Sequence, residues 1–277
     1  MQKSNVFAIA KQFGIAAVLA TGVSAVSAGG VFTVNPGYFG APNFPGAQTP
    51  FQADKLGSTG VTRATLSAAF GSAAGTVTGI GYSQYNSFSL AASPLGALSS
   101  GLGINYTLWT EYSYTMTLVS GGLGNVNSSY VINNVMLNFY GESLGGANTV
   151  FNAGNLGTNP TTAHSGDTQL LGGGMLLAGV ADINSLGGTS FNPVMLFGLT
   201  PQGSSFFTAP NPFFPLAFAS FTNTSLGVTR NIPGQSLYIV TDGGTDFNNP
   251  VPEPMSLALA GIALLGAGVA GRRATRK

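Results

Sequence analysis

The stretch INYTLWTEYSYTMTLVS, residues 104–120, alternates in polarity with a period of two, and no other feature restricts the fold of this chain as strongly. Such a period indicates a β-strand, because successive side chains point to opposite faces of a sheet. An apolar face beside a polar one is typical of an antiparallel strand with one side in water. Because the stretch is long for one strand, we expect a bend or bulge around Thr110. The apolar face holds Ile104, Tyr106, Leu108, Tyr112, Tyr114, Met116 and Leu118, and the polar face holds Asn105, Thr107, Glu111, Ser113, Thr115 and Thr117, joined by Trp109 and Val119.

Further strands are predicted throughout the body of the chain, residues 29–250. No part of this body keeps the apolar period of 3.6 that indicates a long helix. Clusters of Gly, Asn and Pro separate the candidate strands, so we predict an all-β fold, an antiparallel β-sandwich or jelly-roll-like pair of sheets. Residues 170–183 contain three successive glycines and are expected as two strands joined by a glycine turn, or as one strand with a bulge. The other candidates are residues 31–34, 62–70, 76–82, 87–90, 130–140, 191–199, 216–222 and 236–241.

Aromatic residues are densest in residues 199–221. Four prolines in this stretch rule out a long helix, although Pro201 can open a short one over residues 202–207. We expect a packed corner that leads into a strand, because aromatic rings bury much area. The alternative is an exposed aromatic shelf for sugar rings or partner proteins.

The first 28 residues have the composition of a secretory signal peptide. Lys3 and Lys11 precede an apolar run that is too short to span a bilayer, and small residues follow it. We predict cleavage by signal peptidase after Ala28 or Ala25; the alternative is a buried N-terminal helix. The chain is therefore expected to be exported.

The last 27 residues combine three features in a fixed order. Val251, Pro252, Glu253 and Pro254 come first, residues 255–271 carry no charge, and Arg272 and Arg273 follow. At ~1.5 Å per residue the uncharged run forms a helix of about 25 Å, close to the ~30 Å of a hydrocarbon core. We predict a single C-terminal transmembrane helix, with the basic tail in the cytoplasm and residues 29–250 forming an extracytoplasmic β-domain.

This ending resembles the PEP-CTERM sorting segment of exported bacterial proteins. The resemblance implies that residues 251–277 hold the chain in the membrane until an exosortase-type enzyme cuts it near Val251, Pro252, Glu253 and Pro254, while Arg272 and Arg273 stop transfer. The stretches FTVNPGYFG, FQADKLG and TPQGSSFFTAPNPFFPLAFASF resemble flocculation-associated members of that group. They imply a protein that helps cells aggregate in a polysaccharide matrix, and they carry no catalytic residues. A simple tail anchor is the alternative.

Charge is scarce in this chain, which limits its partners. Charged residues make up 6% of the sequence, against about 25% in an ordinary soluble domain. Lys55, Arg63 and Arg230 are the only basic residues of the body, so no binding of nucleic acid is expected. The chain has no cysteine and therefore no disulfide.

Few residues of the body could act in catalysis or bind a metal ion. His164 is the only histidine and no nucleophile elbow accompanies it, so we expect a surface loop residue. Glu111 and Glu142 are the only glutamates of the body and are expected to be solvated. Asp242 and Asp246 fit either a calcium site or an Asp-Gly turn. We predict no cofactor.

Together these features predict a non-enzymatic protein of the cell envelope or extracellular matrix. Its expected partners are signal peptidase, an exosortase-type enzyme, the membrane and exopolysaccharide. A precursor tethered to the inner membrane is expected to give a product at the cell surface or in the matrix. The rival hypotheses are a permanently tail-anchored structural protein and a polysaccharide-modifying enzyme that uses Glu111 and Glu142.

Overall fold

The computed structural model describes residues 30–40, 42–46, 49–146, 148–222, 228–231 and 235–248. The predicted signal peptide with Ala28, the motif Val251–Pro254, the uncharged run 255–271 and Arg272 and Arg273 lie outside these residues. No helix in the described part of the chain is long and apolar enough to cross a membrane. The elements are β1 (Phe32–Val34), η1 (Pro36–Phe39), β2 (Phe51–Ala53), β3 (Lys55–Leu66), β4 (Thr76–Leu90), β5 (Ser93–Leu95), α2 (Ala97–Ser100), β6 (Tyr106–Ser120), β7 (Ser128–Ser143), β8 (Val150–Asn152), β9 (Thr161–Ala163), β10 (Thr168–Ile183), β11 (Thr189–Leu199), α3 (Pro201–Phe206), β12 (Phe207–Ala209), β13 (Leu216–Thr222), β14 (Val228–Asn231) and β15 (Ser236–Asn248).

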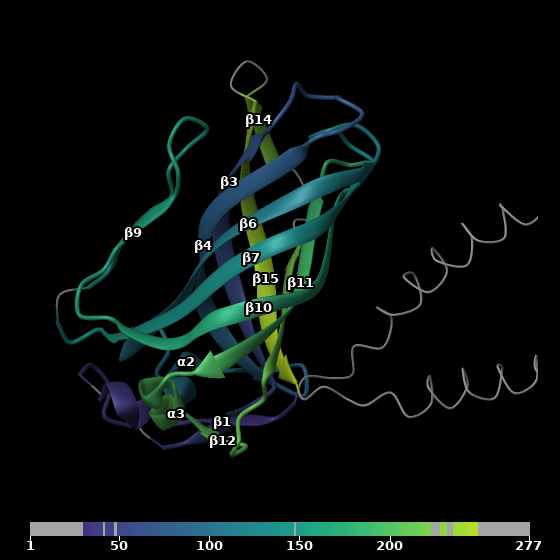
Figure 1. Cartoon of the computed structure of the whole chain (residues 1–277). Coiled ribbons are helices and arrows are strands. Elements are labelled where there is room, and N and C mark those ends of the chain that lie inside the picture. Colours follow the sequence, from purple (N-terminus) through teal and green to yellow (C-terminus); the bar gives the residue numbers. More distant parts are fainter. Residues whose placement is uncertain are drawn as a thin grey trace, which may run out of the picture.

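The main sheet closes on itself (Figure 1). Ten described strands belong to it. Of these, β5 pairs only with β4 and β14 pairs only with β15, and the other eight strands form the ring. Their order is β3-β4-β6-β7-β10-β11-β13-β15, each antiparallel to the next, and β15 pairs with both β13 and β3. The prediction of an all-β antiparallel fold is confirmed, whereas the prediction of a sandwich or jelly roll is wrong. Closure through the β13–β15 pairing removes the edge strands that two packed sheets would leave unpaired.

Several strands are longer than predicted because pairing overrides local turn signals. The candidates 76–82 and 87–90 form the single strand β4, and residues 170–183 form one bulged strand, β10. The predicted Asp-Gly turn is wrong: Asp242 and Gly243 lie inside β15, opposite Thr59 and Ser58. The bulge expected around Thr110 is also misplaced, because β6 and β7 shift register between Thr115 and Met116.

Most of the buried side chains of β6 are those of the predicted apolar face. Tyr106, Leu108, Tyr112, Tyr114 and Met116 are buried inside the ring. They divide between two apolar clusters, one around Tyr106 and Leu108 and the other around Tyr112, Tyr114 and Met116. The period of two therefore identified which side chains form the core.

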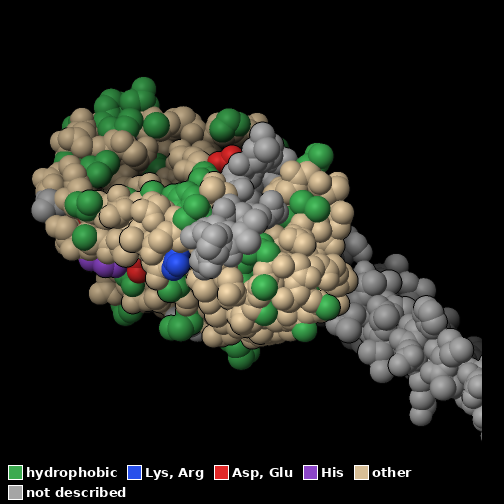
Figure 2. Space-filling view, turned by 90° about the horizontal axis from the view of Figure 1, so that it is seen from above, with side chains coloured by type: hydrophobic (Ala, Val, Ile, Leu, Met, Phe, Trp, Pro, Cys, Tyr) green, Lys and Arg blue, Asp and Glu red, His purple; other side chains and the backbone are tan. Residues whose placement is uncertain are grey.

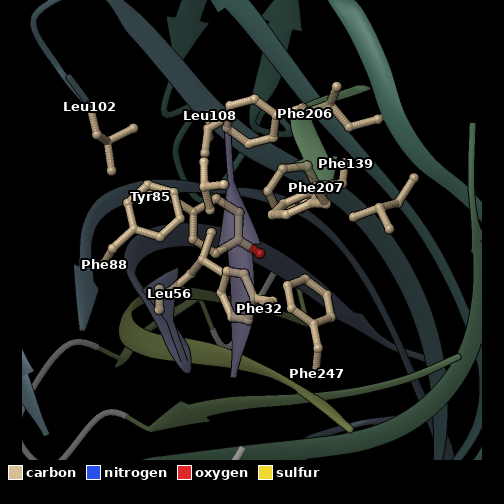
Figure 3. Packing of buried hydrophobic residues seen from close by; sticks show 14 of the residues in the cluster. Phe32, Leu56, Tyr85, Phe88, Leu102, Leu108, Phe139, Phe206, Phe207 and Phe247 are labelled. Atoms are coloured by element: carbon tan, nitrogen blue, oxygen red, sulfur yellow. The ribbon is translucent and has the colours of Figure 1, made fainter. Parts of the chain in front are cut away.

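One end of the ring is covered by β1, β12 and α3 (Figure 1), and buried phenylalanines pack there against side chains of the ring (Figure 3). Phe32 of β1 makes edge contacts with Phe207 and Phe247, with ring centroids 5.8 and 5.3 Å apart. Phe206, Phe207 and Phe214 are buried, so the prediction of a packed corner is confirmed, and these rings form no exposed shelf. The short helix opened by Pro201 is also confirmed as α3.

The close fit of α3 depends on two residues. Thr200 caps the helix by accepting a hydrogen bond from the Gly203 amide. A Cβ at Gly203 would lie 1.9 Å from the carbonyl oxygen of Leu170. Glycine therefore lets α3 rest directly on β10.

The interior of the ring leaves little free space. Buried polar groups pair across it: the Tyr85 hydroxyl lies 2.8 Å from Thr110 Oγ1 and 2.9 Å from Thr245 Oγ1. A cavity of about 40 Å³ lies among Tyr114, Phe191 and other side chains, room for one or two waters. A small-molecule pocket takes about 300–1,000 Å³, so the outer surface is where a ligand site must be sought.

Candidate functional site

A hairpin lies against the outer face of the closed sheet, and we call it the outer arm (residues 148–167). It contains β8 and β9, which pair only with each other, with Phe151 opposite Thr162. In Figure 1 the arm rises beside the sheet at the left without joining it. The residue pattern does not predict these strands, because each has only three residues.

The arm covers an aromatic cluster on the outer face. Trp109 points outward from β6 and is nevertheless fully buried. Its ring stacks on Tyr140 of β7 at 5.6 Å and meets Phe151 of the arm edge-on at 5.4 Å. Phe151 also lies 5.3 Å from Tyr82 of β4. The arm therefore explains why a tryptophan occupies the polar face of β6.

Glu142 holds the beginning of the arm. Its Oε1 accepts a hydrogen bond of 2.6 Å from the Thr149 amide, and its Oε2 accepts one of 2.9 Å from the Thr149 hydroxyl. The side chain is 2% exposed, so the expectation of a solvated glutamate is wrong for Glu142. The chain folds back after β7, so that Thr149 supplies the Glu142 carboxylate with the hydrogen-bond donors that water would otherwise provide. The spacing of residues in the sequence does not predict this contact.

The far end of the arm is bound to β3 and β15. Arg63 donates from Nε to the Leu156 carbonyl at 2.9 Å and from Nη1 to Asn159 Oδ1 at 2.9 Å. Ser236 Oγ donates to the same Leu156 carbonyl at 3.0 Å. The arm is thus attached at both ends and through Phe151 in the middle.

His164 lies between two carboxylates at the base of the arm. Its Nε2 is 2.7 Å from Glu111 Oε1, and its Nδ1 is 2.8 Å from Asp167 Oδ2. The side chain is 38% exposed, which confirms the predicted surface loop position, but the pairing with Glu111 was not expected. Glu111 is itself only partly exposed, because Trp109 and Thr162 also donate to its Oε1.

These neighbours decide the charge of the imidazole. Burial alone lowers the pKa of His164, but the hydrogen bond that His164 donates to Asp167 and the negative charges of Glu111 and Asp167 outweigh it. The net result is a pKa above the usual 6.5. Tyr140 faces the same charges, and burial together with Glu111 and Asp167 raises the pKa of its hydroxyl. The cluster therefore favours a positively charged His164.

A groove of about 340 Å³ lies between the arm and the outer faces of β4, β6 and β7. Its volume falls in the range of small-molecule sites, about 300–1,000 Å³. Both polar and apolar side chains line it. Its lining includes Ile80, Tyr82, Glu111, Ser113, Met136, Asn138, Thr162 and His164.

The aspartates considered for calcium lie elsewhere, on β15. Asp242 is exposed, and Asp246 is partly buried. Burial raises the pKa of Asp246, Lys55 lowers it and Asp54 raises it, with a net increase. Within the described ranges no group of three or more His, Asp or Glu side chains is arranged to hold a metal ion. The calcium alternative therefore gains no support from the described residues.

Comparison with known proteins adds no relative: no family, no curated protein and no solved structure matches this chain.

Proposed function

We propose that this chain is an exported, non-enzymatic protein of the cell envelope or extracellular matrix that associates with exopolysaccharide in cell aggregates. An exosortase-type enzyme processes its C-terminal segment after signal peptidase has removed the N-terminal one. The observation that carries this proposal is the order of the last 27 residues: Val251–Pro254, then residues 255–271 without a charge, then Arg272 and Arg273. A secretory signal at the other end requires the same orientation in the membrane.

The surface of the body supports a polysaccharide partner. Outward positions of neighbouring strands carry hydroxyl groups side by side, as in the row Thr65, Thr78 and Thr115 across β3, β4 and β6. Charged side chains are few on the face shown in Figure 2. Hydroxyl and amide groups exchange hydrogen bonds with a polyhydroxyl polymer without the cost of removing water from charges.

The rival enzyme hypothesis needs Glu111 and Glu142 to act as a pair. The β6–β7 register sets Glu142 opposite Thr107, four residues from Glu111 along the strand. At ~3.3 Å per residue that separation is about 13 Å, beyond the roughly 5–9.5 Å of glycosidase carboxylates. Glu142 is also engaged by Thr149. Loss of turnover on matrix polymer in an E111Q variant would support the rival.

The proposal is tested by the intact mass of the protein from membrane and matrix fractions of the native host. We expect an N-terminus at Gly29 or Val26 and a C-terminus between Pro252 and Pro254. An E253A variant should retain the tail through Lys277, whereas P250A, a matched change outside the motif, should be processed normally. A wild-type protein found only in membranes and still ending at Lys277 would instead identify a permanent tail anchor.

A further inference from the structure

We propose that the groove between the outer arm and the closed sheet binds neutral or amino-sugar units of a polysaccharide and rejects uronic acid units. This inference deepens the proposed function and rests on it, since it assigns the polysaccharide partner to one site. It follows from the shape of the groove, the hydrogen-bonding groups in its walls and its charge.

The shape of the groove suits a pyranose ring. Ile80 of β4 and Met136 of β7 stand in it with 44% and 61% of their surface exposed, beside the ring of Tyr82. A sugar ring presents C–H groups on one face and hydroxyls around its edge. The apolar side chains can therefore cover the face of the sugar ring while polar groups bind the hydroxyls at its edge. Ligand sites commonly combine apolar contacts with a few polar groups in this way.

The polar walls offer both donors and acceptors. Asn138 Oδ1 accepts from Gln169 Nε2 at 3.0 Å, which orients the Asn138 amide and leaves its N–H groups as donors. Ser113 adds a hydroxyl. The donors to Glu111 found in the described part of the chain, Trp109, Thr162 and His164, all meet Oε1. Oε2 remains as an acceptor for a sugar hydroxyl.

The charge of the site selects among sugars. Glu111 and Asp167 contribute two negative charges, which the imidazolium of His164 offsets only in part, so the site is negative in either state of the histidine. Arg63 is the basic side chain that contacts the arm among the described residues, and it is bound to Leu156 and Asn159. A uronate would face uncompensated repulsion in a partly desolvated groove, whereas a hydroxyl or an ammonium group would not.

Other features of the described residues fit a polysaccharide less well. The internal cavities of about 40 and 20 Å³ are too small for a sugar ring. Met175 and Leu177 are exposed on β10, but they do not line the groove. Met175, 58% exposed, is therefore a matched control for Met136.

The test measures binding of the full chain, purified in detergent, by isothermal titration calorimetry. The probes are oligosaccharides of glucose, of glucosamine and of galacturonate. We expect binding of at least one of the first two, with galacturonate at least about tenfold weaker, or ~1.4 kcal/mol. M136R should weaken binding by about tenfold or more by filling the groove, and M175R should change it less than about twofold.

The outcomes separate this site from the wider proposal. Equal effects of M136R and M175R, with wild-type binding intact, would overturn the groove as the site and leave the polysaccharide partner standing. Preference for galacturonate would overturn the charge argument. Binding of no saccharide would overturn both the inference and the proposed partner, while C-terminal processing would be judged separately by mass. An N138A variant that weakens binding would support the site independently of added bulk.

Discussion

Phe151 is the residue through which the middle of the outer arm packs against the sheet, and F151A should free this part of the arm while leaving the ring folded. Phe151 contacts Tyr82 and Trp109, and the hairpin that carries it pairs with no strand of the ring. The chain contains one tryptophan, Trp109, which lies directly beneath the arm. Its fluorescence therefore reports the position of the arm without interference from other sites.

The size of the effect follows from these contacts. Two aromatic pairs contribute about 0.5–1.5 kcal/mol each, and burial of roughly half of a phenylalanine adds about 1 kcal/mol. Together they amount to about 2–4 kcal/mol, which increases the population with an open arm by roughly 30- to 1,000-fold. The loss of global stability is limited to the free energy of arm docking, because a ring with an open arm remains folded.

The assay combines the emission maximum of Trp109 with quenching by acrylamide at constant pH. In F151A we expect a red shift and stronger quenching than in the wild type, both appearing well before the global urea transition. V150A is the matched control, since the Val150 side chain on the same strand is 64% exposed and its loss should cost less than about 0.5 kcal/mol. Unchanged emission and quenching in F151A, or an equal change in V150A, would refute the arm as the cover of Trp109.

Two further changes test the base of the arm. Because the pKa of His164 is raised in the folded protein, its pairing with Glu111 and Asp167 stabilises fully below about pH 6.5 and is lost as the pH rises through the folded pKa. Quenching of Trp109 should therefore increase between pH 6 and pH 9 in the wild type and stay flat in H164Q; equal pH profiles would contradict this. E142Q replaces a charged acceptor of two hydrogen bonds and should lower the free energy of unfolding by about 1–3 kcal/mol in urea titrations. An unchanged urea midpoint would show that Glu142 does not hold the arm.

The predicted and observed strands agree where alternation along the strand itself determines the structure. In β6 the alternation of Tyr and Leu with Thr and Ser identified both the strand and its inner face, because a strand exposes successive side chains to opposite environments. The same reasoning failed in β15, where Asp242 and Gly243 favour a turn but are paired on both sides, with β3 and β13. Two neighbouring strands supply enough hydrogen bonds to outweigh the local preference.

The contacts that form the candidate site are not predicted by the residue pattern. Glu111 and His164 were each recognised as chemically interesting, but they are 53 positions apart and meet only because the arm folds back over β6. Glu142 was expected in water and is instead covered by Thr149. Polarity predicts whether a side chain can be solvated; it does not predict which other segment takes the place of water.

Local residue chemistry was thus sufficient for the all-β class, the position of most long strands and the core face of β6, since these depend on neighbours along the chain. Closure of the ring between β13 and β15, the covering of Trp109 and the charge cluster at His164 depend on segments that are distant in sequence. An alternating strand specifies that one face must be covered, and many arrangements meet that requirement. Only the packed tertiary structure selects one of them, because the free energy of each contact depends on every other segment being in place.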